Sequence, residues 1–164
     1  MAIRKFVVER LILVTARPFG EVVAVIEKAI GHPDMRKFGA SVAAASSWQE
    51  LEETVQNAIG PSGFMEFARF NLGQIIEKAR GAEAPKILRL VIGNPLIMKK
   101  MAEHVPDTAS YAPVTILIDQ RADGVHLSYD SMASYLEPYG NQDALKVARE
   151  LDAKVEALLR TAAN

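Results

Sequence analysis

Cysteine is absent from the 164 residues of this chain. Its absence excludes disulfide bridges, zinc sites built on thiolates and cysteine nucleophiles. A chain without disulfides suits a reducing compartment, and we therefore expect a cytoplasmic protein.

Long apolar runs and an excess of charge are also missing. No run approaches the roughly 18 apolar residues of a membrane-spanning helix, so we expect no membrane partner. Arg4 and Lys5 precede an apolar stretch, but Glu9 and Arg10 interrupt it, which argues against a signal peptide. The formal net charge is −1, so the composition gives no global sign of nucleic-acid binding, and we expect no nucleic-acid partner.

Recognised catalytic and phosphate-binding motifs are missing as well. There is no Gly-x-Gly-x-x-Gly, no Walker-type Gly-Lys-Ser/Thr and no Gly-x-Ser-x-Gly, so neither a nucleotide site nor a serine hydrolase has independent support. What the chain does have is 49% apolar and 24% charged residues, the composition of a globular protein. We expect one domain over residues 1–164.

The rest of the chain is organised around residues 86–105. The apolar run Ile87–Ile92 predicts a strand that ends at Gly93, and Asn94 and Pro95 then have the pattern of a helix cap and first helical residue. Two interpretations stay open. The turn can hold an anion on its unpaired N–H groups, or Asn94 simply caps the helix.

Flanking patterns predict alternating strands and helices. Strands are expected at 6–16, 64–70, 114–118 and 125–129, and helices at 18–30, 33–45, 48–59, 72–80, 95–105, 132–136 and from 142 onward. Asp-Gly at 123–124 indicates a hairpin, which makes an antiparallel pair the most secure one. We therefore expect an α+β fold with helices packed on one face of a mainly antiparallel sheet.

The order of these elements resembles the DUF302 family, also called TT1751-like. Gly93-Asn94-Pro95 after an apolar strand, Pro113 before the next strand, the Asp-Gly hairpin and the string from Ser128 to Met132 carry the resemblance, which covers about residues 6–30 and 64–160. It implies a TBP-like two-layer arrangement with a curved sheet and self-association as a homodimer. The helical segment near 32–60 would be an insertion. The family has no assigned activity, so the resemblance implies no catalytic residue and no cofactor.

The candidate ligand-binding residues lie beside the central stretch. They are Asn94, Met98, Met101, His104, Tyr129 and Asp130. The histidines at 32, 104 and 126 lack the His-x-x-x-His spacing of a helical metal site, and we expect no metal.

Three functions remain open from the sequence. The first is a small ligand bound in a cleft between sheet and helices, lined by Tyr129, Met98, Met101 and either Trp48 or Phe38, with the helical segment as a lid. The second is a homo-oligomeric interaction domain without catalytic activity. The third is a hydrolase or isomerase that uses His104 or His126 with a nearby acid.

Overall fold

The computed structural model describes residues 3–164, which form a five-stranded sheet. The strands are β1 (Arg10–Thr15), β2 (Met65–Asn71), β3 (Ile87–Gly93), β4 (Val114–Arg121) and β5 (Gly124–Asp130). Their order is β1-β5-β4-β3-β2, and every neighbouring pair is antiparallel. The predicted α+β class is confirmed. The first strand is shorter than expected, because β5 ends at Asp130 opposite Arg10 and leaves residues 6–8 without a strand to pair with.

Helices connect these strands in the predicted order. They are α1 (Phe19–Ala29), α2 (Met35–Ala44), α3 (Trp48–Gln56), α4 (Gly73–Arg80), α5 (Pro95–Ala102), α6 (Met132–Leu136) and α7 (Gln142–Ala163), with 3-10 turns at Pro106–Ser110 and Glu137–Tyr139. Within the described residues, no helix is long and apolar enough to cross a membrane.

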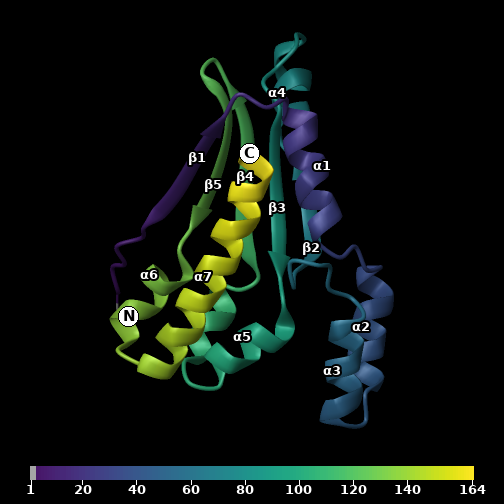
Figure 1. Ribbon diagram of the computed structural model, residues 1–164, viewed down its shortest axis with the longest axis vertical. Helices are drawn as coiled ribbons and strands as arrows, with labels where there is room; N and C mark the ends of the chain where they lie inside the picture. Colours follow the sequence, from purple (N-terminus) through teal and green to yellow (C-terminus); the bar gives the residue numbers. More distant parts are fainter. Residues whose placement is uncertain (1–2) are drawn as a thin grey trace.

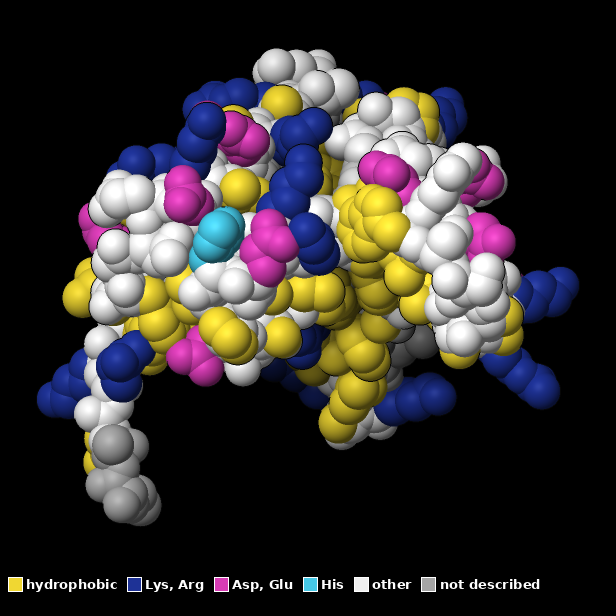
Figure 2. Space-filling view, turned by 90° about the horizontal axis from the view of Figure 1, so that it is seen from below, with side chains coloured by type: hydrophobic (Ala, Val, Ile, Leu, Met, Phe, Trp, Pro, Cys, Tyr) yellow, Lys and Arg dark blue, Asp and Glu magenta, His cyan; other side chains and the backbone are white. Residues whose placement is uncertain are grey.

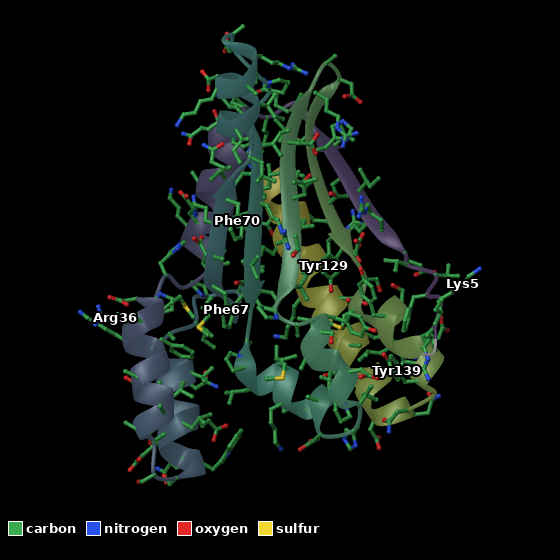
Figure 3. All side chains as sticks on the ribbon, turned by 180° about the vertical axis from the view of Figure 1, so that it is seen from behind. Lys5, Arg36, Phe67, Phe70, Tyr129 and Tyr139 are labelled. Carbon is green, nitrogen blue, oxygen red and sulfur yellow. The ribbon has the colours of Figure 1, made fainter. Side chains whose placement is uncertain are left out.

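Helices α1 and α7 cover one face of the sheet (Figure 1). Alternation along the strands fits this arrangement, because residues two apart share a face. Leu88, Leu90 and Ile92 of β3 are buried toward the helices, whereas Arg89 is exposed on the opposite side. Figure 3, seen from behind, shows no helix over that opposite side, which we call the open face.

Helix α7 contributes one long apolar stripe to the core. The buried residues of α7 are Ala144, Leu145, Ala148, Leu151, Val155, Leu158, Leu159 and Ala162. These residues recur at helical spacing, and all except Leu145 pack in one cluster with inward residues of α1, β3, β4 and β5. Asn141 caps α7, because its side-chain oxygen accepts the Ala144 N–H at 3.0 Å.

The two edges of the sheet differ. Strand β2 carries a bulge near Phe67, and its outer side is bridged at its start by Gly31, which pairs with Met65. Strand β1 is regular, and Ile12 and Val14 are 55% and 50% exposed on it. Bulges and covering segments blunt a sheet edge against further pairing. Only β1 therefore presents an unblunted edge among the described strands.

The helical hairpin of α2 and α3 stands beside the sheet and extends past its end (Figure 1). Ser47 caps α3, because its hydroxyl accepts the Glu50 N–H, and Glu50 in turn accepts from the Ser46 backbone. This is a capping box with the return bond shifted by one residue. Only Val55 is fully buried in the two helices.

One carboxylate joins the end of β5 to both α6 and α7. Asp152 of α7 accepts the Tyr129 hydroxyl at 2.6 Å and the Ser131 hydroxyl at 2.7 Å. It also accepts the backbone N–H groups of Met132 at 2.8 Å and Ala133 at 3.0 Å. These two N–H groups begin α6 and have no partner within their own helix. Asp152 therefore caps α6 from another helix.

Replacing Asp152 with alanine should lower the free energy of unfolding by about 3 kcal/mol, because several donors, including a buried tyrosine hydroxyl, lose their acceptor. Tyr129→Phe removes one of the four bonds and should cost about 1 kcal/mol. Urea denaturation measures both values.

The matched control is Glu156→Ala, which removes an ion pair with Arg160 on the outer side of the same helix. It should change stability by less than about 1 kcal/mol. An equal loss in the Asp152 and Glu156 variants would show that the carboxylate does not hold these elements together.

Candidate functional site

Asn94 lies at the joint between β3 and α5. Its side-chain oxygen accepts the Leu96 N–H at 2.9 Å, and its side-chain amide donates to the Gly63 carbonyl at 3.0 Å. The predicted helix cap is confirmed. Because both ends of the side chain are engaged within the chain, Asn94 also ties α5 to the loop that precedes β2.

An inner cavity of about 100 Å³ adjoins this joint. It lies between the end of the sheet, α5 and α7, and its lining is Phe67, Gly93, Asn94, Pro95, Ile97, Met98, Met101, Ala112, Pro113, Val114 and Leu151. Gly93 lies close to the opposite wall, because an added Cβ would stand 3.0 Å from the Pro113 side chain and that side chain would have to shift slightly. A cavity of ~150 Å³ can hold benzene, so this smaller one suits an alkyl chain better than a ring.

An outer hollow of about 390 Å³ opens between α3, α5 and α7. It shares Asn94, Ile97 and Leu151 with the inner cavity, so the two adjoin. Trp48 is 51% exposed at its wall, and the Lys99 ammonium lies 5.4 Å from the indole ring centre. Seen from below, Figure 2 shows apolar side chains running between two lobes of the surface, with basic side chains alongside.

Charge at the outer hollow is mixed. Lysines 99, 100 and 154 line it together with Glu52 and Glu150. Lys99 is paired with Glu103, whose pKa is lowered chiefly by that hydrogen bond. Lys100 and Lys154 have no carboxylate partner among the described residues, so two ammonium groups remain available to an anion.

Tyr129 and Asp130 lie elsewhere. Tyr129 is 3% exposed and points into the helix layer, where burial and the Asp152 carboxylate raise the pKa of its hydroxyl well above the ordinary value. Asp130 lies on the open face and binds Arg10 through two bonds, and the hydrogen bond from Arg10 lowers the pKa of this carboxyl. Both residues line a separate hollow on the open face.

The histidines do not line these hollows. His104 is exposed, and its ring lies 3.9 Å from the Glu103 carboxylate. His126 is buried on the open face and contacts Asp123 at 2.8 Å, a hydrogen bond that lowers the pKa of Asp123. Over residues 3–164, no group of three or more histidine or acidic side chains is arranged to hold a metal ion.

The structure thus divides the six predicted residues into three groups. Asn94, Met98 and Met101 meet at the inner cavity, while Tyr129 and Asp130 border the open-face hollow on the other side of segment 112–114. His104 belongs to neither. Trp48 lines the outer hollow, which adjoins the inner cavity of the first group. Phe38 does not line the outer hollow.

Asp152 was not singled out from the sequence as a functional or structural residue. A signal was present, because Ala148 four residues before it and Val155 three residues after it belong to the apolar stripe. An acid between two buried positions borders the core and needs hydrogen-bond donors there.

The comparisons with known proteins agree with this two-layer α+β architecture. The sequence profile described as "Domain of unknown function DUF302" matches residues 40–162, and the chain belongs to this family. The matched range contains α3 and part of α2, within the segment predicted as an insertion, and it starts after α1.

A solved structure supports the same fold. It is described as the crystal structure of an uncharacterized conserved protein DUF302 from Bacillus stearothermophilus, and it superposes with a TM-score of 0.64 at 10% identity. The match covers 94% of this chain and 98% of the other. No match is found among curated proteins. The comparisons therefore establish family and fold.

Asn94→Ala should lower the free energy of unfolding by about 2 kcal/mol, because it removes a helix cap and leaves the Gly63 carbonyl without its donor. Asn94→Asp keeps the capping oxygen and loses only the donor, so about half of that loss is expected. Chemical denaturation measures both.

Asn141→Ala is the comparison, because the Asn141 side chain only caps a helix. It should lower the free energy of unfolding by about 1 kcal/mol. If the alanine and aspartate variants of Asn94 were equally destabilised, the capping oxygen would not contribute at this joint.

Proposed function

We propose that this protein binds a small amphipathic anion, with an alkyl portion in the inner cavity and an acidic head group among the lysines of the outer hollow. The observation that carries the proposal is the adjacency of the two spaces at Asn94, Ile97 and Leu151. An apolar pocket with a few polar groups at its mouth is the usual form of a small-molecule site.

The size and lining agree with such a ligand. The outer hollow, at about 390 Å³, falls in the range of roughly 300–1,000 Å³ common for ligand pockets. Met98 and Met101 line the inner space with flexible thioether side chains, which adapt to alkyl groups of different shape. The hairpin of α2 and α3, which was predicted from the sequence as a lid, carries Trp48 at the wall of the outer hollow.

Trp48 is the single tryptophan of the chain and therefore reports on this site alone. Titration with decanoate should shift its emission to shorter wavelength and saturate, because the acyl chain displaces water from the exposed indole. Decan-1-ol, which lacks the charge, should bind more weakly.

The head-group contact is tested with the double variant Lys100→Gln, Lys154→Gln. It should weaken decanoate binding roughly fourfold to tenfold, since an exposed charge pair contributes up to about 1 kcal/mol. Lys78→Gln on α4 is the control and should leave binding unchanged. A Trp48 spectrum that does not respond to decanoate at millimolar concentration contradicts the proposal.

A second candidate, self-association as a homodimer, is favoured by the edge of β1. The Ser131 N–H donates to the Glu9 carbonyl, so odd-numbered residues of β1 pair with β5. In an antiparallel ladder the alternate residues, Arg10, Ile12 and Val14, then direct their backbone groups outward. A second copy of the same edge, turned by a twofold axis, offers matching donors and acceptors.

Sedimentation velocity at micromolar concentration should give a dimer for the wild type. Ile12→Lys with Val14→Lys should give a monomer, because edge lysines oppose strand pairing. Ile75→Lys is the control, since Ile75 is 65% exposed on α4 away from this edge. A monomeric wild type at high micromolar concentration would exclude this assembly.

The enzymatic alternative has weaker support. A His/acid contact exists between His126 and Asp123, but neither it nor His104 borders the hollows described above. The proposal of ligand binding therefore stands ahead of hydrolase or isomerase chemistry.

A further inference from the structure

The open face of the sheet carries a hollow of about 610 Å³, larger than the inner cavity and the outer hollow. Strands β3, β4 and β5 form its floor, and segment 109–114 with Tyr135 forms its wall. No helix covers it in the view from behind (Figure 3). The hollow is therefore open to a ligand from solvent.

The register of the strands places polar side chains together on this floor. Arg89 of β3 lies opposite Leu117 of β4, which lies opposite Ser128 of β5. Thr115 lies two residues from Leu117 and shares the same face. A guanidinium and two hydroxyls thus line the same hollow, with Leu117 between Arg89 and Ser128.

Arg89 differs from the other arginines on the strands. Arg10 binds Asp130, Arg69 binds Glu27 and Glu66, and Arg121 binds Asp119. Within residues 3–164, Arg89 has no carboxylate partner. Its nearest polar contact is the Thr115 hydroxyl at 3.4 Å, which is long for a hydrogen bond.

The position of Arg89 is nevertheless supported. Its guanidinium carbon lies 5.7 Å from the ring centre of Phe70, within the range of a cation–π contact. Figure 3 shows Phe70 on the open face. A planar guanidinium held beside a ring keeps donors available for an oxyanion, which it binds through two parallel bonds.

Ser128 adds a second polar group to the lining of the hollow. The residue is 8% exposed, and its hydroxyl is not among the buried polar atoms that lack a partner. Because Ser128 lines the hollow, a ligand bound there can reach its hydroxyl.

The wall of the hollow is aromatic. The rings of Tyr111 and Tyr135 are stacked, with centres 4.6 Å apart and planes 12° from parallel. Arg10 and Asp130 at the other side neutralise each other. Arg89 therefore leaves the hollow with a net positive charge, beside a flat apolar wall.

We propose that the open face binds a small flat organic oxyanion, with its carboxylate or phosphate on Arg89 and its remaining polar atoms within reach of Ser128 and Thr115. This site is separate from the inner cavity and from the outer hollow beside Trp48. It shares only segment 112–114 with the inner cavity. Its ligand would also be rigid, whereas the inner cavity suits an alkyl chain.

The test is titration of the full-length protein with benzoate, phenyl phosphate and the neutral analogue benzamide, followed by amide chemical shifts. At least one oxyanion should give saturable shifts at Thr115, Leu117 and Ser128, and benzamide should not. Shifts with benzoate only assign a carboxylate ligand, and shifts with phenyl phosphate only assign a phosphate. Trp48 emission should stay unchanged, which distinguishes binding on the open face from binding at the outer hollow.

Arg89→Gln should weaken oxyanion binding at least fivefold while the protein remains folded, since the side chain is exposed. Ser128→Ala should give a smaller loss. Arg36→Gln is the control, because Arg36 is an exposed arginine on α2 outside this hollow. Unchanged affinity in Arg89→Gln, saturable shifts confined to α3 and α5, or no saturable shift with either oxyanion would overturn the proposal.

Discussion

The Asp152 carboxylate is the contact on which the arrangement of the helix layer depends. It gathers a tyrosine hydroxyl from the last residues of β5, a serine hydroxyl and two N–H groups of α6, while itself belonging to α7. A partly buried acceptor with four donors fixes three elements at once, because leaving any of those donors unpaired costs free energy. Tyr129, expected at a ligand site, is therefore part of this structural network.

A second constraint is that the helices cover only one face of the sheet (Figures 1 and 3). The covered face buries aliphatic residues of β3, β4 and β5 in one cluster, and a cavity lies at its end beside Asn94. The open face keeps the alternate residues, among them Arg89, Ser128 and Asp130. Two kinds of hollow follow from this asymmetry: an apolar cavity that adjoins a hollow lined by lysines, and a polar hollow on the open face.

Local signals in the sequence predicted much of this structure. Asn94 caps α5, Asn141 caps α7, and His126, Ser128 and Asp130 share one face of β5, as cap chemistry and strand alternation require. The candidate site was less predictable. Met98 and Met101 do line the inner cavity with Asn94, as predicted. Tyr129 and Asp130 were grouped with them, but Tyr129 points into the helix layer and Asp130 lies on the open face.

The sequence by itself determined the class of fold, the ends of most helices and strands, and the family resemblance, because periodicity and caps act over a few residues. Only the tertiary structure decided which polar groups meet. Asp152 reaches Tyr129 across 23 residues, and the register of β4 places Arg89 and Ser128 on either side of Leu117. Local patterning encodes neither arrangement. Which residues face a hollow depends on strand order and helix placement, and these are set by packing of the whole core.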